Sequence, residues 1–132
     1  MSTQDLESRI VQGLSDAALP ELDTFAVEAL AAQVDLENDQ LSFGSPTLLV
    51  AVTGFDCAQG DADGDELSVA FVAVVPGADQ AARRQDALDA LRAIRRWMDD
   101  AQTPFVPKAI RIERLHPLTV AALFATCVGE AL

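Results

Sequence analysis

Two apolar segments joined by a short polar connection indicate the architecture of this chain. The segments are Thr47 to Phe55 (TLLVAVTGF) and Leu67 to Val75 (LSVAFVAVV), and their aliphatic and β-branched residues are typical of buried strands. The connection, Asp56 to Glu66 (DCAQGDADGDE), is rich in residues that favour turns. We therefore expect two strands joined as a hairpin and a fold organised around a sheet.

The first helix is predicted near the amino end. Aliphatic residues recur there at four-residue spacing and polar residues occupy the other faces. The repeating positions are Leu6, Ile10 and Leu14. Ser2 followed by Asp5 forms a weak capping box, and Leu19-Pro20 predicts the end of the helix.

A second, longer helix is predicted from a cap at Asp79 to about Asp100. Its buried stripe is expected to contain Ala87, Leu88, Leu91, Ile94, Trp97 and Met98. Five arginines are expected on the remaining surface, namely Arg83, Arg84, Arg92, Arg95 and Arg96. The pairs Asp89 with Arg92, Arg95 with Asp99 and Arg96 with Asp100 have the spacing of ion pairs within a helix. The arginines are therefore either a solvated face or a contact with a partner.

Three further strands are predicted. Between Glu21 and Leu36 the alanines suit a helix, but Thr24 to Leu30 favours a short strand. Ile110 and Ile112 alternate with charged residues, which is strand spacing. Leu118 to Leu132 is apolar on both faces, and its threonines and valines favour a strand over a helix.

These elements predict an α+β fold. The order is helix, three strands, helix and two strands, and short connections favour a mostly antiparallel sheet of about five strands with two helices packed on it. With 132 residues, of which 50% are hydrophobic, residues 1–132 are expected to form a single domain with one core.

Charge is distributed unevenly along the chain. The net charge is −12, and residues 1–82 hold fifteen acidic residues and one basic residue, whereas residues 83–132 hold six acidic and eight basic residues. This excess of acid argues against nucleic acid as an attracted ligand. The asymmetry favours either head-to-tail contacts between copies or an acidic surface that aids solubility.

Residues suited to catalysis or metal binding are sparse. The single histidine, His116, precedes a proline, and no serine or cysteine has a setting typical of a nucleophile. Cys57 and Cys127 are expected to be small buried hydrophobes. Asp61, Asp63 and Asp65 alternate like calcium ligands, but the diagnostic glycine and glutamate of such a loop are missing. We therefore predict no enzyme, cofactor or metal site.

No membrane association is expected, because the longest apolar runs are far shorter than the ~20 residues of a spanning helix. The first fifteen residues lack the pattern of a secretion signal, so we expect synthesis in the cytosol.

Five segments follow one another in a recognisable order. They are the amino-terminal helix LESRIVQGL, the strands PTLLVAVTGFD and LSVAFVAVV, the arginine-bearing helix ALDALRAIRRWM and the closing strands RIERLHPLTVAALFATCVGEAL. Together they resemble tail terminator proteins of long-tailed bacteriophages, including the group found in Mu-like phages. The resemblance covers nearly the whole chain as an order of elements, and it transfers no functional residue.

This resemblance implies a structural protein of the virion. Similar proteins form a hexameric ring that caps the tail tube at its head-proximal end, stops polymerisation and joins the head. The implied partners are further copies of the chain, the major tail tube protein and the connector or neck proteins, with assembly in the host cytoplasm. An acidic lumen would allow DNA to slide through the ring without sticking.

From the charge pattern we select candidate interface residues, namely Asp61, Asp63, Asp65, Arg83, Arg92, Arg95 and Arg96. Two alternatives stay open: another neck or head-completion protein, and a small bacterial ligand-binding or regulatory domain.

Overall fold

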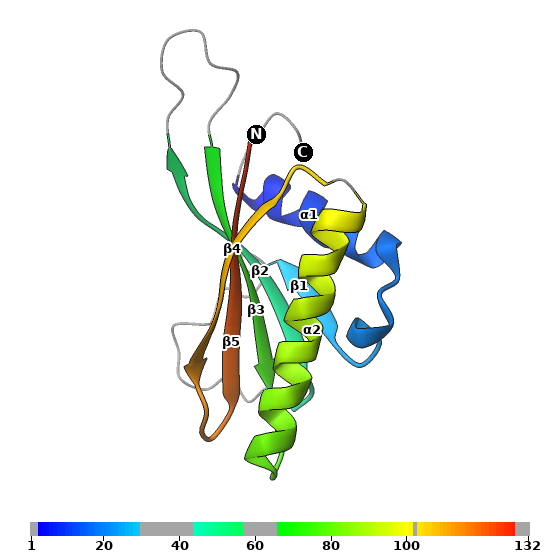
Figure 1. Ribbon diagram of the computed structural model, residues 1–132, viewed down its shortest axis with the longest axis vertical. Coiled ribbons are helices and arrows are strands. Elements are labelled where there is room, and N and C mark those ends of the chain that lie inside the picture. The colour runs from blue at the N-terminus through cyan, green and yellow to red at the C-terminus, as the bar shows by residue number, and fades with distance from the viewer. Residues whose placement is uncertain (1–2, 30–43, 57–65, 102, 129–132) are drawn as a thin grey trace, which may run out of the picture.

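The computed structural model describes residues 3–29, 44–56, 66–101 and 103–128 (Figure 1). The elements are α1 (Thr3–Ala17), a short 3-10 helix η1 (Pro20–Leu22), β1 (Ala26–Ala29), β2 (Thr47–Asp56), β3 (Glu66–Val75), α2 (Gln80–Asp100), β4 (Val106–Arg114) and β5 (Thr119–Val128). The predicted α+β class and the predicted order of elements are confirmed.

One five-stranded sheet has the order β1-β2-β3-β5-β4. The pairs β2 with β3, β3 with β5 and β5 with β4 are antiparallel, whereas β1 runs parallel to β2. Because β5 inserts between β3 and β4, the closing hairpin leaves β4 at one edge of the sheet and β1 at the other.

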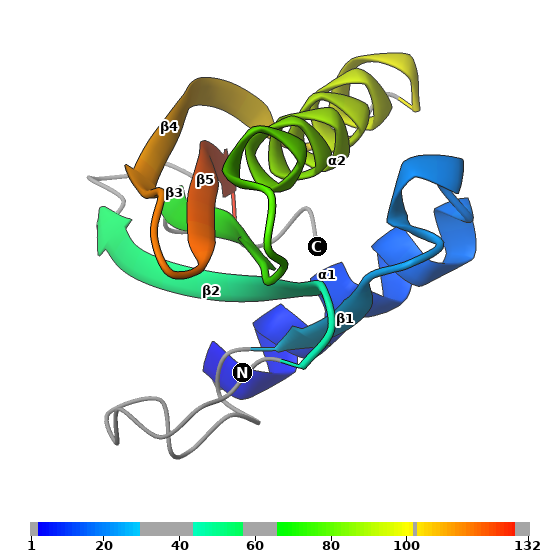
Figure 2. The same cartoon turned by 90° about the horizontal axis from the view of Figure 1, so that it is seen from below.

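Both helices lie on the same side of the curved sheet (Figure 2). Their apolar stripes meet alternate residues of the strands, including Phe71 of β3 and Leu123 of β5, which are fully buried. Phe105 completes this core, with its ring centroid 5.7 Å from that of Phe71 and 6.0 Å from that of Trp97. The single core predicted from composition therefore lies between the sheet and the helices.

The start and end signals of the helices act at the predicted places. The Asp79 side chain accepts hydrogen bonds from the backbone N–H groups of Ala81 and Ala82, as an amino-terminal cap should. Helix α1 ends at Ala17, and Pro20 then begins η1. Leu6, Ile10 and Leu14 are buried, as their spacing predicted.

The carboxylate of Glu7 links α1 to the sheet. Its Oε2 accepts a hydrogen bond of 2.8 Å from the backbone N–H of Val52, beside the irregularity in strand register between Val52 and Gly54. Only 2% of Glu7 is exposed. A register shift leaves backbone groups without their regular ladder partners, so this carboxylate supplies an acceptor there.

Two further strand predictions are confirmed within the described residues. The strand expected over Thr24 to Leu30 is confirmed at Ala26–Ala29. It pairs in parallel with β2, which the length of the segment between them, residues 30–46, permits. The strand expected within Leu118 to Leu132 is confirmed at Thr119–Val128. Ser2, Cys57 and most of the Asp56 to Glu66 connection lie outside the described residues.

None of the helices in the described ranges has the length and apolar character that a membrane span requires.

Candidate functional site

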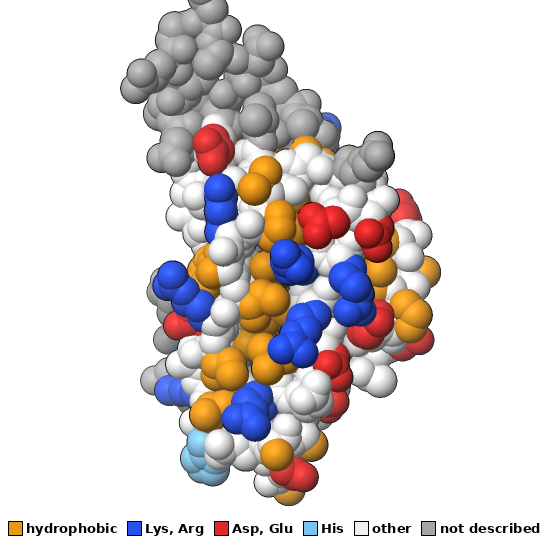
Figure 3. All heavy atoms as spheres, viewed as in Figure 1, with side chains coloured by type: hydrophobic (Ala, Val, Ile, Leu, Met, Phe, Trp, Pro, Cys, Tyr) orange, Lys and Arg blue, Asp and Glu red, His pale blue; other side chains and the backbone are white. Residues whose placement is uncertain are grey.

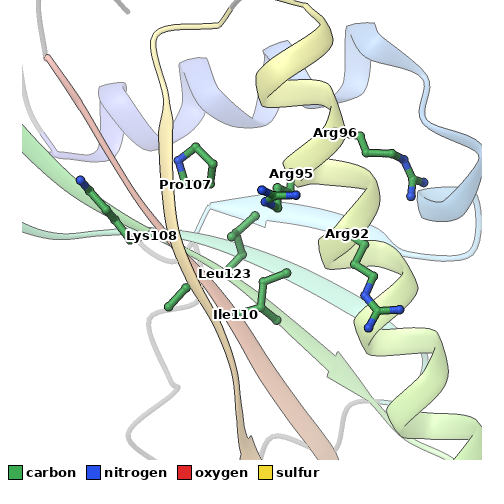
Figure 4. Close-up of a pocket in the computed structure, with 8 residues that line it drawn as sticks. Arg92, Arg95, Arg96, Pro107, Lys108, Ile110 and Leu123 are labelled. Atoms are coloured by element: carbon green, nitrogen blue, oxygen red, sulfur yellow. The ribbon is translucent and has the colours of Figure 1, made fainter.

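A groove of about 540 Å³ runs between α2 and the edge strand β4. Helix α2 packs mainly over β3 and β5, so the side of β4 that faces the helix is only partly covered. The groove is lined by Arg92, Arg95, Arg96, Pro107, Lys108, Ala109, Ile110 and Leu123 (Figure 4). On the molecular surface it is an apolar strip bordered by basic side chains (Figure 3).

The floor of the groove is apolar because of the pairing of β4 with β5. Ile110 is opposite Leu123, so both side chains lie on the same face of the sheet. Leu123 belongs to the buried core, and Ile110 packs against that core while remaining partly exposed. The groove is thus an exposed extension of the main core.

Basic side chains form the walls of the groove. Arg95 extends from α2 toward the apolar strip, whereas Arg96 points toward η1 and Lys108 points away from α2 (Figure 4). Lys108 lies at a register irregularity between Pro107 and Ala109. Among the described residues that line the groove none is acidic, so these residues give its walls an excess of positive charge.

The ion pairs within α2 that the residue spacing allows are not formed among the described residues. Arg96 instead binds Glu21 of η1, with 3.0 Å between its Nη2 and the Oε1 of Glu21. Its side chain reaches across to η1 because that turn packs against α2. Asp89 accepts a hydrogen bond from Gln85, and in the described part of the chain no carboxylate lies within 4 Å of the cationic groups of Arg92 or Arg95.

The prediction that Arg83 belongs to an interacting surface is also wrong, because only 4% of this residue is exposed. Its guanidinium donates hydrogen bonds to the backbone oxygens of Gly77 and Leu115, at 2.6 and 2.7 Å, and to the hydroxyl of Thr119 at 3.2 Å. Gly77 has φ +141°, which favours glycine, in the turn that offers this oxygen. Arg83 is therefore a structural residue that joins two turns.

The remaining candidate residues separate into two groups. Arg92, Arg95 and Arg96 are exposed and come together in the groove, as the helical spacing suggested. Asp61, Asp63 and Asp65 lie outside the described residues. Sequence reasoning missed Pro107, Ile110 and Leu123 as groove residues, although the alternation around Ile110 was a signal for a half-exposed strand.

Neither protein-family models nor curated proteins give a match to this sequence. The geometry of the described residues therefore provides the argument for function. Guanidinium and ammonium groups beside aliphatic side chains suit a ligand or partner surface that combines carboxylates with apolar residues.

Other reactive groups lie away from the groove or are buried. Cys127 is buried, as predicted, and burial together with the negative charge of Glu66 raises the pKa of its thiol to about 11. His116 lies exposed in the turn between β4 and β5. Within the described ranges, no group of three or more histidine, cysteine or acidic residues is arranged to hold a metal ion.

Proposed function

We propose that this protein is a structural virion component that assembles into a ring, most specifically a tail terminator of a long-tailed phage. In this role a hexameric ring caps the tail tube, ends its polymerisation and offers a surface for joining the head. The observation that carries the proposal is the basic groove, with Arg92 and Arg95 exposed, on a chain whose net charge is −12. A second copy of this acidic chain can therefore supply negative charge to the basic groove.

The fold is consistent with this proposal. The resemblance implied a sheet flanked by helices, and the sheet ends in two different edges, β1 and β4. A contact between unlike surfaces of identical subunits closes into a ring when its rotation is suitable. Two edges with different surfaces are a simple way to make such a contact.

Native mass spectrometry and ring averages from electron microscopy test the proposal. Both are carried out on the purified protein alone and after mixing with the major tail tube protein. We expect hexameric rings in at least one condition, bound at the end of the tube when it is present. A strict monomer in both conditions contradicts the proposal, and rings that bind only connector proteins would indicate another neck component.

The groove volume favours one second candidate function. Small-molecule sites are typically clefts of about 300 to 1,000 Å³ with apolar walls and a few polar groups, and this groove lies within that range. A ligand-binding domain would take an anionic amphiphile here and remain a monomer or dimer. Calorimetric titration with a medium-chain fatty acid, together with the oligomeric state, separates this function from ring assembly.

A further inference from the structure

The two edges of the sheet differ in charge. The side built from α1, η1 and β1, residues 3–29, contains six acidic residues and one basic residue. At the other edge, β4 contains Lys108, Arg111 and Arg114 against Glu113, and the groove adds the arginines of α2. In Figure 3 most visible acidic side chains lie to the right of the basic side chains that border the apolar strip. Opposite edges of one subunit are therefore electrostatically complementary.

The β4 edge also exposes apolar side chains. Val106 is 52% exposed and Ile112 is 40% exposed, and both belong to the edge strand. Ile112 is opposite Ala121 and therefore lies on the same face of the sheet as Ile110 in the groove, which Arg92 and Arg95 also line. Val106 is opposite Thr126 and lies on the other face of the sheet. Large exposed hydrophobic residues gathered around a groove are typical of an interaction surface.

The β1 edge offers a matching surface. A hollow of about 240 Å³ lies between the end of α1, η1 and β1, and its lining includes Leu19, Phe25 and Val27 as partly buried apolar residues. Asp23 also lines this hollow and is exposed. Asp16 is exposed near the end of α1, where its carboxylate accepts a hydrogen bond of 2.8 Å from the Gln12 side chain. Acidic and apolar groups thus lie side by side at this edge too.

We propose that the β1 edge of one copy docks on the β4 edge of the next copy. The carboxylates of Asp16 and Asp23 then face the guanidinium groups of Arg92 and Arg95, and Ile110 and Ile112 contact the hollow between α1 and β1. Each copy contributes one acidic and one basic edge, so the contact is heterologous and repeats around an axis. This inference rests on the proposed function and names the two surfaces that build the ring.

Charge reversal tests the contact between these particular edges. The basic-edge variant carries Arg92→Glu and Arg95→Glu, the acidic-edge variant carries Asp16→Lys and Asp23→Lys, and a third variant combines all four changes in one chain. The readout is the protein concentration at half-assembly, measured by mass photometry or light scattering under the conditions in which the wild type forms rings. Circular dichroism and melting temperature check that each variant folds.

We expect each single-edge variant to raise the half-assembly concentration about tenfold or more, because close charge pairs at interfaces are strongly coupled. The half-assembly concentration of the combined variant should be within about threefold of the wild-type value, since every interface again pairs opposite charges. Arg84→Glu is the matched control. Arg84 is exposed outside the groove, and it lies roughly 12 Å along the helix from Arg92, more than a Debye length of about 8 Å at physiological salt.

Other outcomes overturn the inference in recognisable ways. Suppose that the wild type forms rings but a single-edge variant assembles at the wild-type concentration, or that the combined variant assembles no better than the single-edge variants. Either result excludes this pairing of edges and leaves the proposed function standing. A wild type that remains monomeric with and without tail tube removes both. If a reversal variant does not fold, the neutral pairs Arg92→Gln with Arg95→Gln and Asp16→Asn with Asp23→Asn replace it, and both must weaken assembly.

Discussion

The guanidinium of Arg83 donates a hydrogen bond of 2.7 Å to the backbone oxygen of Leu115. The bond joins the first turns of α2 to the turn between β4 and β5, and Thr119, which is fully buried, lies beside it. A buried cation is tolerated here because carbonyl and hydroxyl oxygens surround it. The position of the β4–β5 hairpin relative to α2, and thereby the shape of the basic groove, depends on this cluster.

Arg83→Met should destabilise the folded protein by about 2 to 4 kcal/mol, because the part-buried carbonyl oxygens of Gly77 and Leu115 and the buried hydroxyl of Thr119 lose a charged donor. Urea unfolding followed by circular dichroism measures the loss. Arg84→Met removes an exposed arginine from the next position and should change stability by less than about 0.5 kcal/mol. Equal stability of the two variants would contradict the structural role of Arg83.

Glu7→Ala should cost about 1 to 3 kcal/mol, because the half-buried N–H of Val52 loses its acceptor. Glu7→Gln should cost less, since its amide oxygen can still accept the hydrogen bond. Thermal unfolding of both variants tests this order. Ser15→Ala, an exposed change on the same helix, provides the reference, and a Gln variant as unstable as the Ala variant would indicate that the negative charge itself is needed.

Arg95→Gln and Arg96→Gln should have different effects on assembly. Arg96 already pairs with Glu21 within its own subunit. Their side chains are 59% and 35% exposed, so solvent screens the pair and it contributes no more than about 1 kcal/mol to stability. Arg95 extends toward the groove and should therefore shift ring formation to higher protein concentration more strongly than Arg96. Both variants should keep the wild-type circular dichroism spectrum, and identical assembly curves for both would count against the groove as an interface.

Stability should fall at alkaline pH because of Cys127. Its pKa is raised from 9.0 to about 11 in the folded protein, so the unfolded chain loses the thiol proton first as pH rises. Stability is therefore complete below pH 9 and decreases between pH 9 and 11, by a total of roughly 2 to 3 kcal/mol. Urea unfolding from pH 7 to 10.5 should show a smaller decrease for Cys127→Ala than for the wild type, and parallel curves would refute this linkage.

The connection from Asp56 to Glu66 remains a sequence-based prediction for its central part. Replacing Asp61, Asp63 and Asp65 with serine should leave the fold intact while reducing tail completion, measured as phage yield. Millimolar calcium should not raise the melting temperature beyond a general salt effect, because the sequence departs from a calcium loop at two diagnostic positions. An unchanged phage yield would show that these aspartates contact no partner in tail completion. A specific rise in melting temperature with calcium would reveal a metal site.

Local sequence patterns were sufficient to predict the elements and the fold class. The strand between Thr47 and Phe55, the cap at Asp79 and the buried positions of α1 all depend on neighbours a few residues away, through side-chain alternation, helical spacing and capping. The arginines of the groove could also be identified, because Arg92, Arg95 and Arg96 lie on one helix whose buried stripe was readable from sequence.

The tertiary structure decided which of these charges are available to a partner. Arg83 was expected on the surface, but it is buried because it meets an oxygen 32 residues away, and Arg96 pairs with Glu21, 75 residues away. Likewise, the apolar floor of the groove exists because β5 inserts beside β3 and leaves β4 at the edge. Such contacts depend on how distant segments pack, and the periodicity of a single helix or strand carries no information about its distant partners.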